Sequence, residues 1–240
     1  MGKQWEVLDT GLGSAEKNMQ IDADLLEGLE SRKNPLIHFY EWEGDSATYG
    51  YFTDPNLFLK SQGVQKRGLQ LARRPTGGGI IFHLWDMAFS AVVPSQSPLF
   101  SLNTLDNYSL INSAVLKSVR SLLGHTQDLE LIVDDFQVQG EKCVHFCMAK
   151  PTKYDVVLEG KKVAGAAQRK TRAGFLHQGT ISLVFPSEDY LRDVLASDAD
   201  VLNAMKQYTF SIFPNGATPG AIREVKEELK SLLTTYLSEF

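Results

Sequence analysis

Two arginines stand two residues before three glycines in the sequence Arg-Arg-Pro-Thr-Gly-Gly-Gly-Ile-Ile-Phe-His, which runs from Arg73 to His83. Glycine has no Cβ, so its backbone N–H groups can approach a bound group closely, and arginine presents a planar fork to a phosphate or carboxylate. Apolar β-branched residues follow the glycines, as at the start of a strand. The stretch predicts an anion-binding loop, with a simple tight turn as the alternative.

A lysine beside a predicted hairpin turn is the second candidate for chemistry. Glu159 and Gly160 separate two apolar segments, and Lys162 opens the returning strand. On a regular strand Lys162 would share one face with Ala164 and Ala166, whose small side chains leave room for a ligand beside the ammonium group. Taken alone, a hairpin lysine in solvent is the simpler interpretation.

The only two cysteines, Cys143 and Cys147, are four residues apart. If the segment 143–148 is a strand, both cysteines and His145 share one face, and such a group could hold zinc. A fourth ligand is not evident in the sequence, which makes a metal site the less favoured interpretation. The alternative for Cys147 is a small buried apolar side chain.

The elements that must position these residues follow a pattern typical of one α+β domain. Helices are expected from the N-cap Ser14, over 105–123, after Pro186 and over 219–239. Strands are expected over 36–42, 47–52, 79–83, 89–93, 129–133, 143–148, 154–158, 162–167 and 175–185. The first two strands would pair as a hairpin, and their aromatic side chains could line a slot for an apolar ligand.

Composition excludes some classes of function. The 240 residues carry a net charge of -5, whereas a nucleic-acid-binding surface is normally basic. No apolar run in the sequence is long enough to span a bilayer, and the N-terminus lacks the apolar core of a secretory signal. The charge and the short apolar runs therefore predict no nucleic-acid or membrane partner. The missing signal core and the presence of only two cysteines predict a cytoplasmic protein.

Four motifs, taken in order, resemble those of the biotin/lipoate protein ligase catalytic family, within the branch of lipoate-protein ligase A and the lipoyl transferases. They are Asn18 to Asp22, Arg73 to His83, Gly160 to Ala167, and the run His177-Gln178-Gly179-Thr180. The resemblance extends from about Trp5 to Phe185. It implies a single catalytic domain over 1–240 of the class II biotin/lipoyl ligase type, with a central mixed β-sheet flanked by helices.

The activity implied by the resemblance is protein lipoylation, in which a lipoyl or octanoyl group is attached to a lysine of a lipoyl domain. The expected partners are lipoyl domains of 2-oxoacid dehydrogenases or the glycine cleavage H protein. In the ligases, ATP and Mg²⁺ activate lipoate or octanoate as an acyl adenylate, and no cofactor is permanently bound. Larger ligases carry an accessory C-terminal domain. We expect none in a chain that ends at Phe240, and a separate partner could supply it.

Site residues are carried over from the same motifs. Lys162 matches the family's essential lysine, which would stabilise charge developing on the carbonyl oxygen and phosphate. Asp155 falls where the ligases hold Mg²⁺, and Gln178 replaces a histidine often found at its position. Arg74 and the glycines would hold the adenylate phosphate, with His83 closing the loop. The residues expected to contact the ligand are Arg74, Thr76, Gly77, Gly78, Gly79, His83, Gly165, Ala167 and Gln178.

Two reactions remain open at this point. Cys147 stands where the cysteine-dependent octanoyltransferases keep a nucleophile that takes the acyl group from acyl carrier protein as a thioester, without ATP. Those enzymes commonly carry a bulkier residue at the third glycine, whereas Gly79 is kept here as in the ligases. We therefore expect an ATP-dependent lipoate-protein ligase, with the octanoyltransferase as the alternative. The intact Lys162 argues against a catalytically silent lipoyl-domain binder.

Overall fold

A seven-stranded mixed β-sheet forms the centre of the computed structural model, which describes residues 5–124, 128–133, 141–196 and 199–240. The strand order is β1-β2-β6-β10-β9-β8-β7. Strands β1 and β2 are parallel, and the other neighbours are antiparallel. The strands are β1 (Glu6–Gly13), β2 (Leu36–Trp42), β6 (Asp86–Pro94), β7 (Leu129–Leu131), β8 (Val156–Leu158), β9 (Lys161–Lys170) and β10 (Gly174–Ser182).

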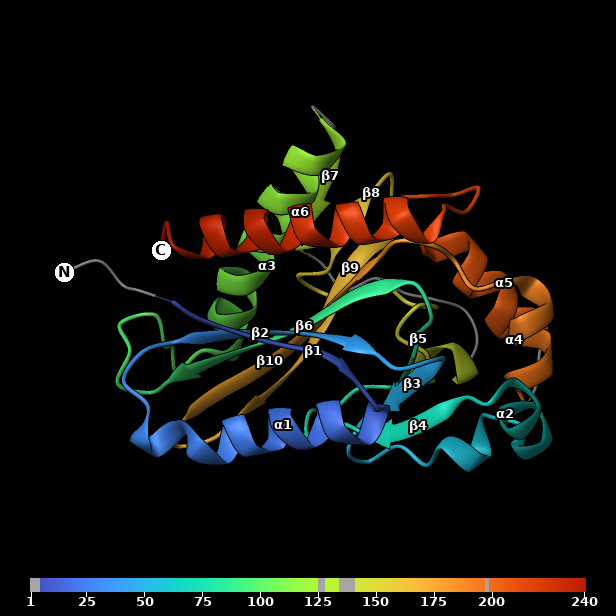
Figure 1. The fold of residues 1–240 in the computed structure, drawn as a ribbon, viewed down its shortest axis with the longest axis horizontal. Helices are drawn as coiled ribbons and strands as arrows, with labels where there is room; N and C mark the ends of the chain where they lie inside the picture. The colour runs from blue at the N-terminus through green and yellow to red at the C-terminus, as the bar shows by residue number, and fades with distance from the viewer. Residues whose placement is uncertain (1–4, 125–127, 134–140, 197–198) are drawn as a thin grey trace.

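A smaller sheet stands beside the larger one, in the order β4 (Gln70–Arg73), β3 (Ser46–Tyr49), β5 (Ile80–His83). Helices α2 (Ser61–Arg67), α4 (Glu188–Val194) and α5 (Ala199–Tyr208) lie next to it in Figure 1. The predicted hairpin between 36–42 and 47–52 is wrong. Strand β2 already has β1 and β6 on its two edges, so the chain leaves the larger sheet and β3 pairs with β4 and β5 instead.

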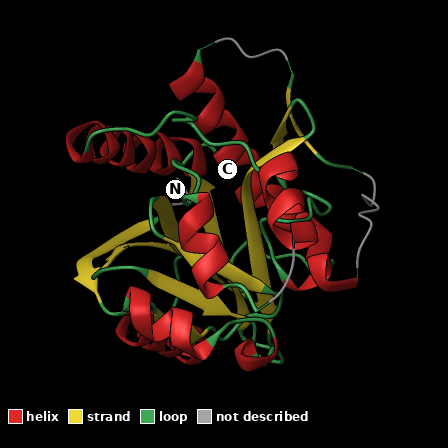
Figure 2. Cartoon of the chain, turned by 90° about the vertical axis from the view of Figure 1, so that its right-hand side faces the viewer, coloured by secondary structure: helices red, strands yellow, loops and turns green. Residues whose placement is uncertain are grey.

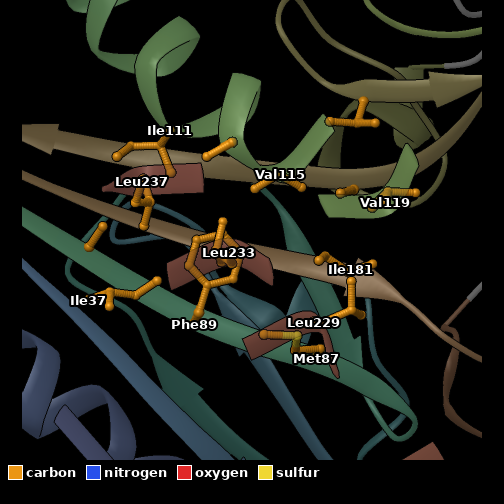
Figure 3. Close-up of a cluster of buried hydrophobic side chains, with 14 of the residues drawn as sticks. Ile37, Met87, Phe89, Ile111, Val115, Val119, Ile181, Leu229, Leu233 and Leu237 are labelled. Atoms are coloured by element: carbon orange, nitrogen blue, oxygen red, sulfur yellow. The ribbon is translucent and has the colours of Figure 1, made fainter. Parts of the chain in front are cut away.

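Two long helices, α3 (Thr104–Leu123) and α6 (Pro219–Leu237), cover one face of the larger sheet (Figure 1). Side chains alternate across a strand, so Met87 and Phe89 of β6 point toward these helices. Figure 3 shows apolar side chains of both helices meeting those of the strands, namely Ile111, Val115 and Val119 of α3 and Leu229, Leu233 and Leu237 of α6. The helices predicted over 105–123 and 219–239 are confirmed. The described helices include none with the length and apolarity needed to cross a membrane.

Helix α1 (Ala15–Glu27) lies on the opposite face, so that helices stand on both sides of the strands (Figure 2). The Ser14 side chain accepts a hydrogen bond from the Lys17 backbone N–H at 3.3 Å, which confirms the predicted N-cap. Met19 packs with Tyr40 and Ala88. Because α1 contacts both sheets, it holds them in a fixed relation.

The hairpin of β8 and β9 turns at Glu159 and Gly160, as predicted, with positive φ values of 52° and 73°. The strand after the turn is not regular. Val156 pairs with Ala164 while Val157 pairs with Lys162, so β9 has one extra residue opposite β8. Such a β-bulge changes which face a side chain takes. Lys162 therefore does not share its face with Ala164, and that prediction is wrong.

The segment predicted as a strand over 143–148 contains a 3-10 helix instead, η3 (Glu141–His145). Its turn is closed by the Phe146 backbone N–H, which donates to the Cys143 carbonyl at 3.1 Å. Cys143 is buried and Cys147 is half-buried, and no described group of three His, Cys, Asp or Glu residues could hold a metal ion. The other short 3-10 helices are η1 (Gly28–Ser31) and η2 (Pro55–Leu57).

Replacing Leu233 by alanine tests the core. Leu233 is fully buried between α6 and the sheet, so its truncation should lower the free energy of unfolding by about 2–5 kcal/mol through lost burial and the cavity left behind. Denaturant unfolding followed by circular dichroism measures this change. Ser231→Ala on the exposed side of the same helix should change stability by less than about 0.5 kcal/mol. Equal effects of the two variants would contradict this packing.

Candidate active site

A cavity of about 310 Å³ opens where the two sheets approach each other. Strands β9 and β10 of the larger sheet and β3 and β5 of the smaller one contribute to its walls, together with the glycine loop and the segment after η3. The predicted site residues that line it are Arg74, Gly77, Gly78, Gly79, His83, Cys147, Lys162, Gly165, Ala167 and Gln178. Two predicted residues, Thr76 and Asp155, stand behind this lining.

The Arg74 guanidinium is buried and bonds the protein itself. Its Nε and Nη2 donate to the Gly77 carbonyl at 3.1 and 2.8 Å, and Nη2 also donates to the Gly79 carbonyl at 2.9 Å. Nη1 donates to the carbonyl and hydroxyl oxygens of Thr48 at 3.3 and 3.2 Å. Nη2 further lies 3.7 Å from Sγ of Cys147. With its N–H groups engaged in this way, Arg74 fixes the shape of the loop, and its expected contact with a ligand phosphate stays a prediction.

Two of the three glycines are required by geometry. Gly78 has a φ of 92°, a conformation that other residues rarely adopt. A Cβ on Gly79 would come within 2.2 Å of the His145 carbonyl oxygen. A Cβ on Gly77 would meet no atom within 4 Å. Gly79 thus allows the backbone at the end of η3 to pass directly over the loop.

The close contact between the His145 backbone and Gly79 sets the position of Cys147. Its backbone N–H donates to the Ile80 carbonyl at 3.0 Å, at the start of β5. Its side chain is half-buried and lines the cavity, with the Arg74 guanidinium beside the sulfur. A positive group at this distance stabilises negative charge on sulfur. Cys143, four residues earlier, is 1% exposed in a separate apolar cluster and has no place in the cavity.

A buried ion pair holds Lys162. Its Nζ lies 2.7 Å from Oδ2 of Asp155, and the two side chains are 10% and 2% exposed. The same Oδ2 accepts from the backbone N–H and the hydroxyl of Thr152, at 2.7 and 2.9 Å. A Cβ on Gly165 would lie 2.1 Å from Cε of Lys162, so the glycine leaves the space that the lysine occupies. The pair fixes one ammonium group at the cavity wall.

Magnesium fits poorly at Asp155. Mg²⁺ is normally bound by one or two carboxylates together with substrate phosphates. Here Oδ2 of Asp155 is taken by Lys162 and Thr152, and no second carboxylate joins it in a metal-binding group among the described residues. The geometry favours Asp155 as the residue that positions Lys162, and we derive no step from a metal here.

Gln178 is held from two sides at the cavity floor. Its Oε1 accepts from the Thr76 hydroxyl at 2.7 Å, and its Nε2 donates to Oδ2 of Asp22 at 2.6 Å. Asp22 is fully buried and also lies 2.9 Å from Nδ1 of His38. Thr76 thus orients Gln178, whose amide belongs to a buried polar network, and the expected contact of Thr76 with a ligand stays a prediction.

His83 connects the loop to Asp86. Its Nδ1 lies 2.6 Å from Oδ2 of Asp86, and its Nε2 lies 2.9 Å from the Thr48 hydroxyl that Arg74 also contacts. Burial raises the pKa of Asp86, but the adjacent His83 and a hydrogen bond from Thr180 outweigh this effect, and the pKa lies below its usual value. Asp86 therefore carries a negative charge at neutral pH.

Sequence reasoning missed three residues that support this site. Tyr108 of α3 lines the cavity, and burial raises the pKa of its hydroxyl, which keeps its proton and can donate to a ligand. Thr152 lies three residues before Asp155, a spacing from which a local side-chain to backbone turn could have been expected. Thr48 carries no such signal, because its role arises from the pairing of β3 with β5.

The chain resembles known proteins over most of its length. The model of the lipoyl protein ligase A/B catalytic domain matches residues 14–229. Octanoyltransferase LipM of Lysinibacillus sphaericus is 29% identical over 209 residues, which cover 85% of this chain and 74% of that protein. Octanoyltransferase LipM of Anoxybacillus flavithermus is 31% identical over 194 residues, which cover 78% of this chain and 68% of that protein.

Solved structures agree on the fold. A bi-partite lipoate protein ligase from Thermoplasma acidophilum has a TM-score of 0.65 at 21% identity, over 99% of this chain and 92% of that chain. The mixed sheet with flanking helices is therefore the architecture of the lipoate ligases, as predicted. From the extent of the family match and the identity to its relatives, this chain belongs to the lipoyl protein ligase A/B catalytic domain family.

Proposed function

We propose that this protein transfers an octanoyl group from acyl carrier protein to a lysine of a lipoyl domain, through a thioester on Cys147. The observation that carries this proposal is the position of the Cys147 sulfur in the cavity that Lys162 also lines, with the Arg74 guanidinium 3.7 Å away. The relatives named above are octanoyltransferases. Geometry and relatives favour this alternative over the expected ATP-dependent ligase.

The reaction has two transfers. In the first, the Cys147 thiolate attacks the carbonyl carbon of the octanoyl thioester and a new C–S bond forms. The C–S bond to the carrier breaks, and the carrier leaves as a thiolate that takes up a proton from solvent. In the second, the neutral amine of the acceptor lysine attacks the Cys147 thioester. The C–N bond of the amide forms, the C–S bond breaks, and the proton lost by nitrogen returns to sulfur.

Two fixed positive groups serve these steps. Arg74 lies against the sulfur, where it stabilises the thiolate as nucleophile and as leaving group. Lys162, held by Asp155, is the donor for the oxyanion that forms on the carbonyl oxygen in each step. Because both groups are already in place, little reorganisation is needed when charge develops.

ATP and Mg²⁺ have no role in this proposal. The N–H groups of Arg74 are engaged with Thr48, the loop carbonyls and sulfur, and Asp155 pairs with Lys162. Both residues would have to exchange these contacts to hold a phosphate and its metal. The acceptor is expected to be a folded lipoyl domain of a 2-oxoacid dehydrogenase or the glycine cleavage H protein, in a cytoplasmic setting.

Two donors offered in parallel to a purified lipoyl domain test the proposal. Octanoyl-acyl carrier protein without ATP should modify the domain, as measured by intact mass. Free lipoate or octanoate with Mg-ATP should give no modification and release no pyrophosphate. Modification in the second tube alone would overturn the proposal in favour of the ligase.

Cysteine substitutions separate the nucleophile from its neighbour. Cys147→Ser should reduce transfer from the acyl carrier protein by at least about a thousandfold, because the serine hydroxyl beside Arg74 is far less acidic than a thiol. Cys143→Ala is the matched control, since that sulfur lies outside the cavity and its loss should leave transfer nearly unchanged. Steady-state rates on a lipoyl domain measure both, and normal transfer by Cys147→Ser would exclude the thioester.

Lys162→Ala should abolish both transfers, with a loss of about a hundredfold or more, because the oxyanion loses its donor and Asp155 is left as an unpaired buried charge. The double variant Lys162→Ala/Asp155→Ala removes the stranded charge. It should recover thermal stability but not activity. Transfer restored in the double variant would contradict a direct role for Lys162.

Gly79→Ala should displace Cys147, because the added Cβ would collide with the His145 backbone. We expect about 1–3 kcal/mol of lost stability and a slower loading of Cys147 with octanoate. Gly77→Ala has open space around the new methyl and should fold with unchanged stability. Thermal unfolding together with the rate of acyl-enzyme formation checks both variants. A Gly79→Ala protein that matches Gly77→Ala in both properties would show that the close passage is not needed.

A further inference from the structure

A second, smaller hollow adjoins the cavity at Lys162. It has a volume of about 30 Å³ and shares Ile81, Lys162, Gly165 and Thr180 with the larger cavity. Cys147 lines only the larger cavity, and the next residue, Met148, lines only the smaller one. The two spaces therefore meet at the lysine assigned to the oxyanion, which is where a second reactant has to arrive.

A carboxylate that borders this hollow has one buried oxygen without a hydrogen-bond partner. Asp86 lines the hollow and is 7% exposed. Its Oδ2 accepts from His83 and from the Thr180 hydroxyl, whereas its Oδ1 is buried without a hydrogen-bond partner in the part of the chain that the structure describes. Leaving a charged oxygen buried and unpaired is costly, so such an atom points to a ligand that donates to it.

The walls of the hollow suit one kind of ligand. Most are apolar, including Leu84, Val163 and Val184, and Trp85 beside them is 44% exposed. A lysine side chain has an apolar stem of four methylenes and a cationic tip, so it can pack its stem along such walls and bring its tip to a carboxylate. A hydrophobic acyl chain would leave Oδ1 of Asp86 without a partner.

We propose that this hollow is the entry site of the acceptor lysine, whose ε-ammonium group donates to Oδ1 of Asp86. The inference rests on the proposed function and adds to it the residue that recognises the incoming amine. It assigns the two substrates to separate openings, with the acyl group in the larger cavity and the acceptor side chain in the smaller hollow.

The position beside Lys162 also prepares the amine to react. Two positive groups close together disfavour the protonated form of each, and the Lys162 ammonium stands at the wall that the two spaces share. The incoming ammonium therefore releases one proton to solvent, and the neutral nitrogen attacks the Cys147 thioester as described above. Asp86 positions the nitrogen and keeps its negative charge throughout the reaction.

The test uses the enzyme already loaded with octanoate on Cys147 and follows its decay with two nucleophiles. A lipoyl domain presents a cationic lysine, whereas hydroxylamine is neutral at neutral pH and needs no carboxylate. Asp86→Asn keeps the size of the side chain but removes its charge. It should slow single-turnover transfer to the lipoyl domain by about tenfold to a hundredfold, the range for loss of a hydrogen bond to a charged group. Its reaction with hydroxylamine should match that of the unaltered protein.

Two further variants complete the test. Asp24→Asn removes an exposed carboxylate of α1 outside both hollows and should behave as the unaltered protein in both reactions. Ser182→Leu fills the smaller hollow without replacing Asp86 and should slow transfer to the lipoyl domain while sparing loading and hydroxylamine cleavage. If Asp86→Asn does not fold, Ser182→Leu tests the acceptor site in its place.

The inference is overturned if Asp86→Asn transfers to the lipoyl domain at the normal rate. It is also overturned if that variant loses both reactions by the same factor, because Asp86 would then act only through His83 and the loop. If Asp86→Asn does not fold, normal transfer by Ser182→Leu overturns it. A failure of the unaltered protein to load octanoate on Cys147 would instead defeat the proposed function, so the two failures are distinguishable.

Discussion

The buried guanidinium of Arg74 is the interaction on which the rest of the site depends. It joins Thr48 of β3, two carbonyls of the glycine loop and the sulfur of Cys147, which belong to three separate segments of the chain. Since arginine cannot lose its proton, each of these contacts persists across the physiological pH range. The loop is thereby shaped by the protein itself, before any substrate arrives.

The two positive groups of the site, Arg74 and Lys162, lie against different parts of the cavity. Arg74 faces sulfur, and Lys162 faces the space where the carbonyl oxygen would lie. Each is restrained by neighbours, Lys162 by Asp155 and Arg74 by Thr48. A preorganised arrangement of this kind stabilises developing charge without the cost of turning dipoles during the reaction. Asp86, on the other side of Lys162, adds a negative charge where an amine would approach.

The sequence was sufficient to predict the long helices, because apolar periodicity is a local signal. The fold class and many of the residues that line the cavity followed from the resemblance of four motifs to a known family. The sequence was not sufficient to predict the roles of the residues that line the cavity. The contacts of Arg74 with the loop carbonyls could not be predicted from its position in the sequence, and the face taken by Lys162 depends on a bulge set by pairing with β8. The 3-10 turn before Cys147 likewise packs closely against Gly79, a contact that no alternation of residue types reveals.

The most direct measurement is the mass of the protein after incubation with octanoyl-acyl carrier protein and no acceptor, followed by fragmentation to locate the adduct. We predict one octanoyl group on Cys147, formed without ATP and released by hydroxylamine. Absence of that adduct, with octanoyl adenylate formed once ATP is supplied, would contradict it. An adduct on Cys143 would contradict it equally, because that sulfur is buried away from Arg74 and from the cavity.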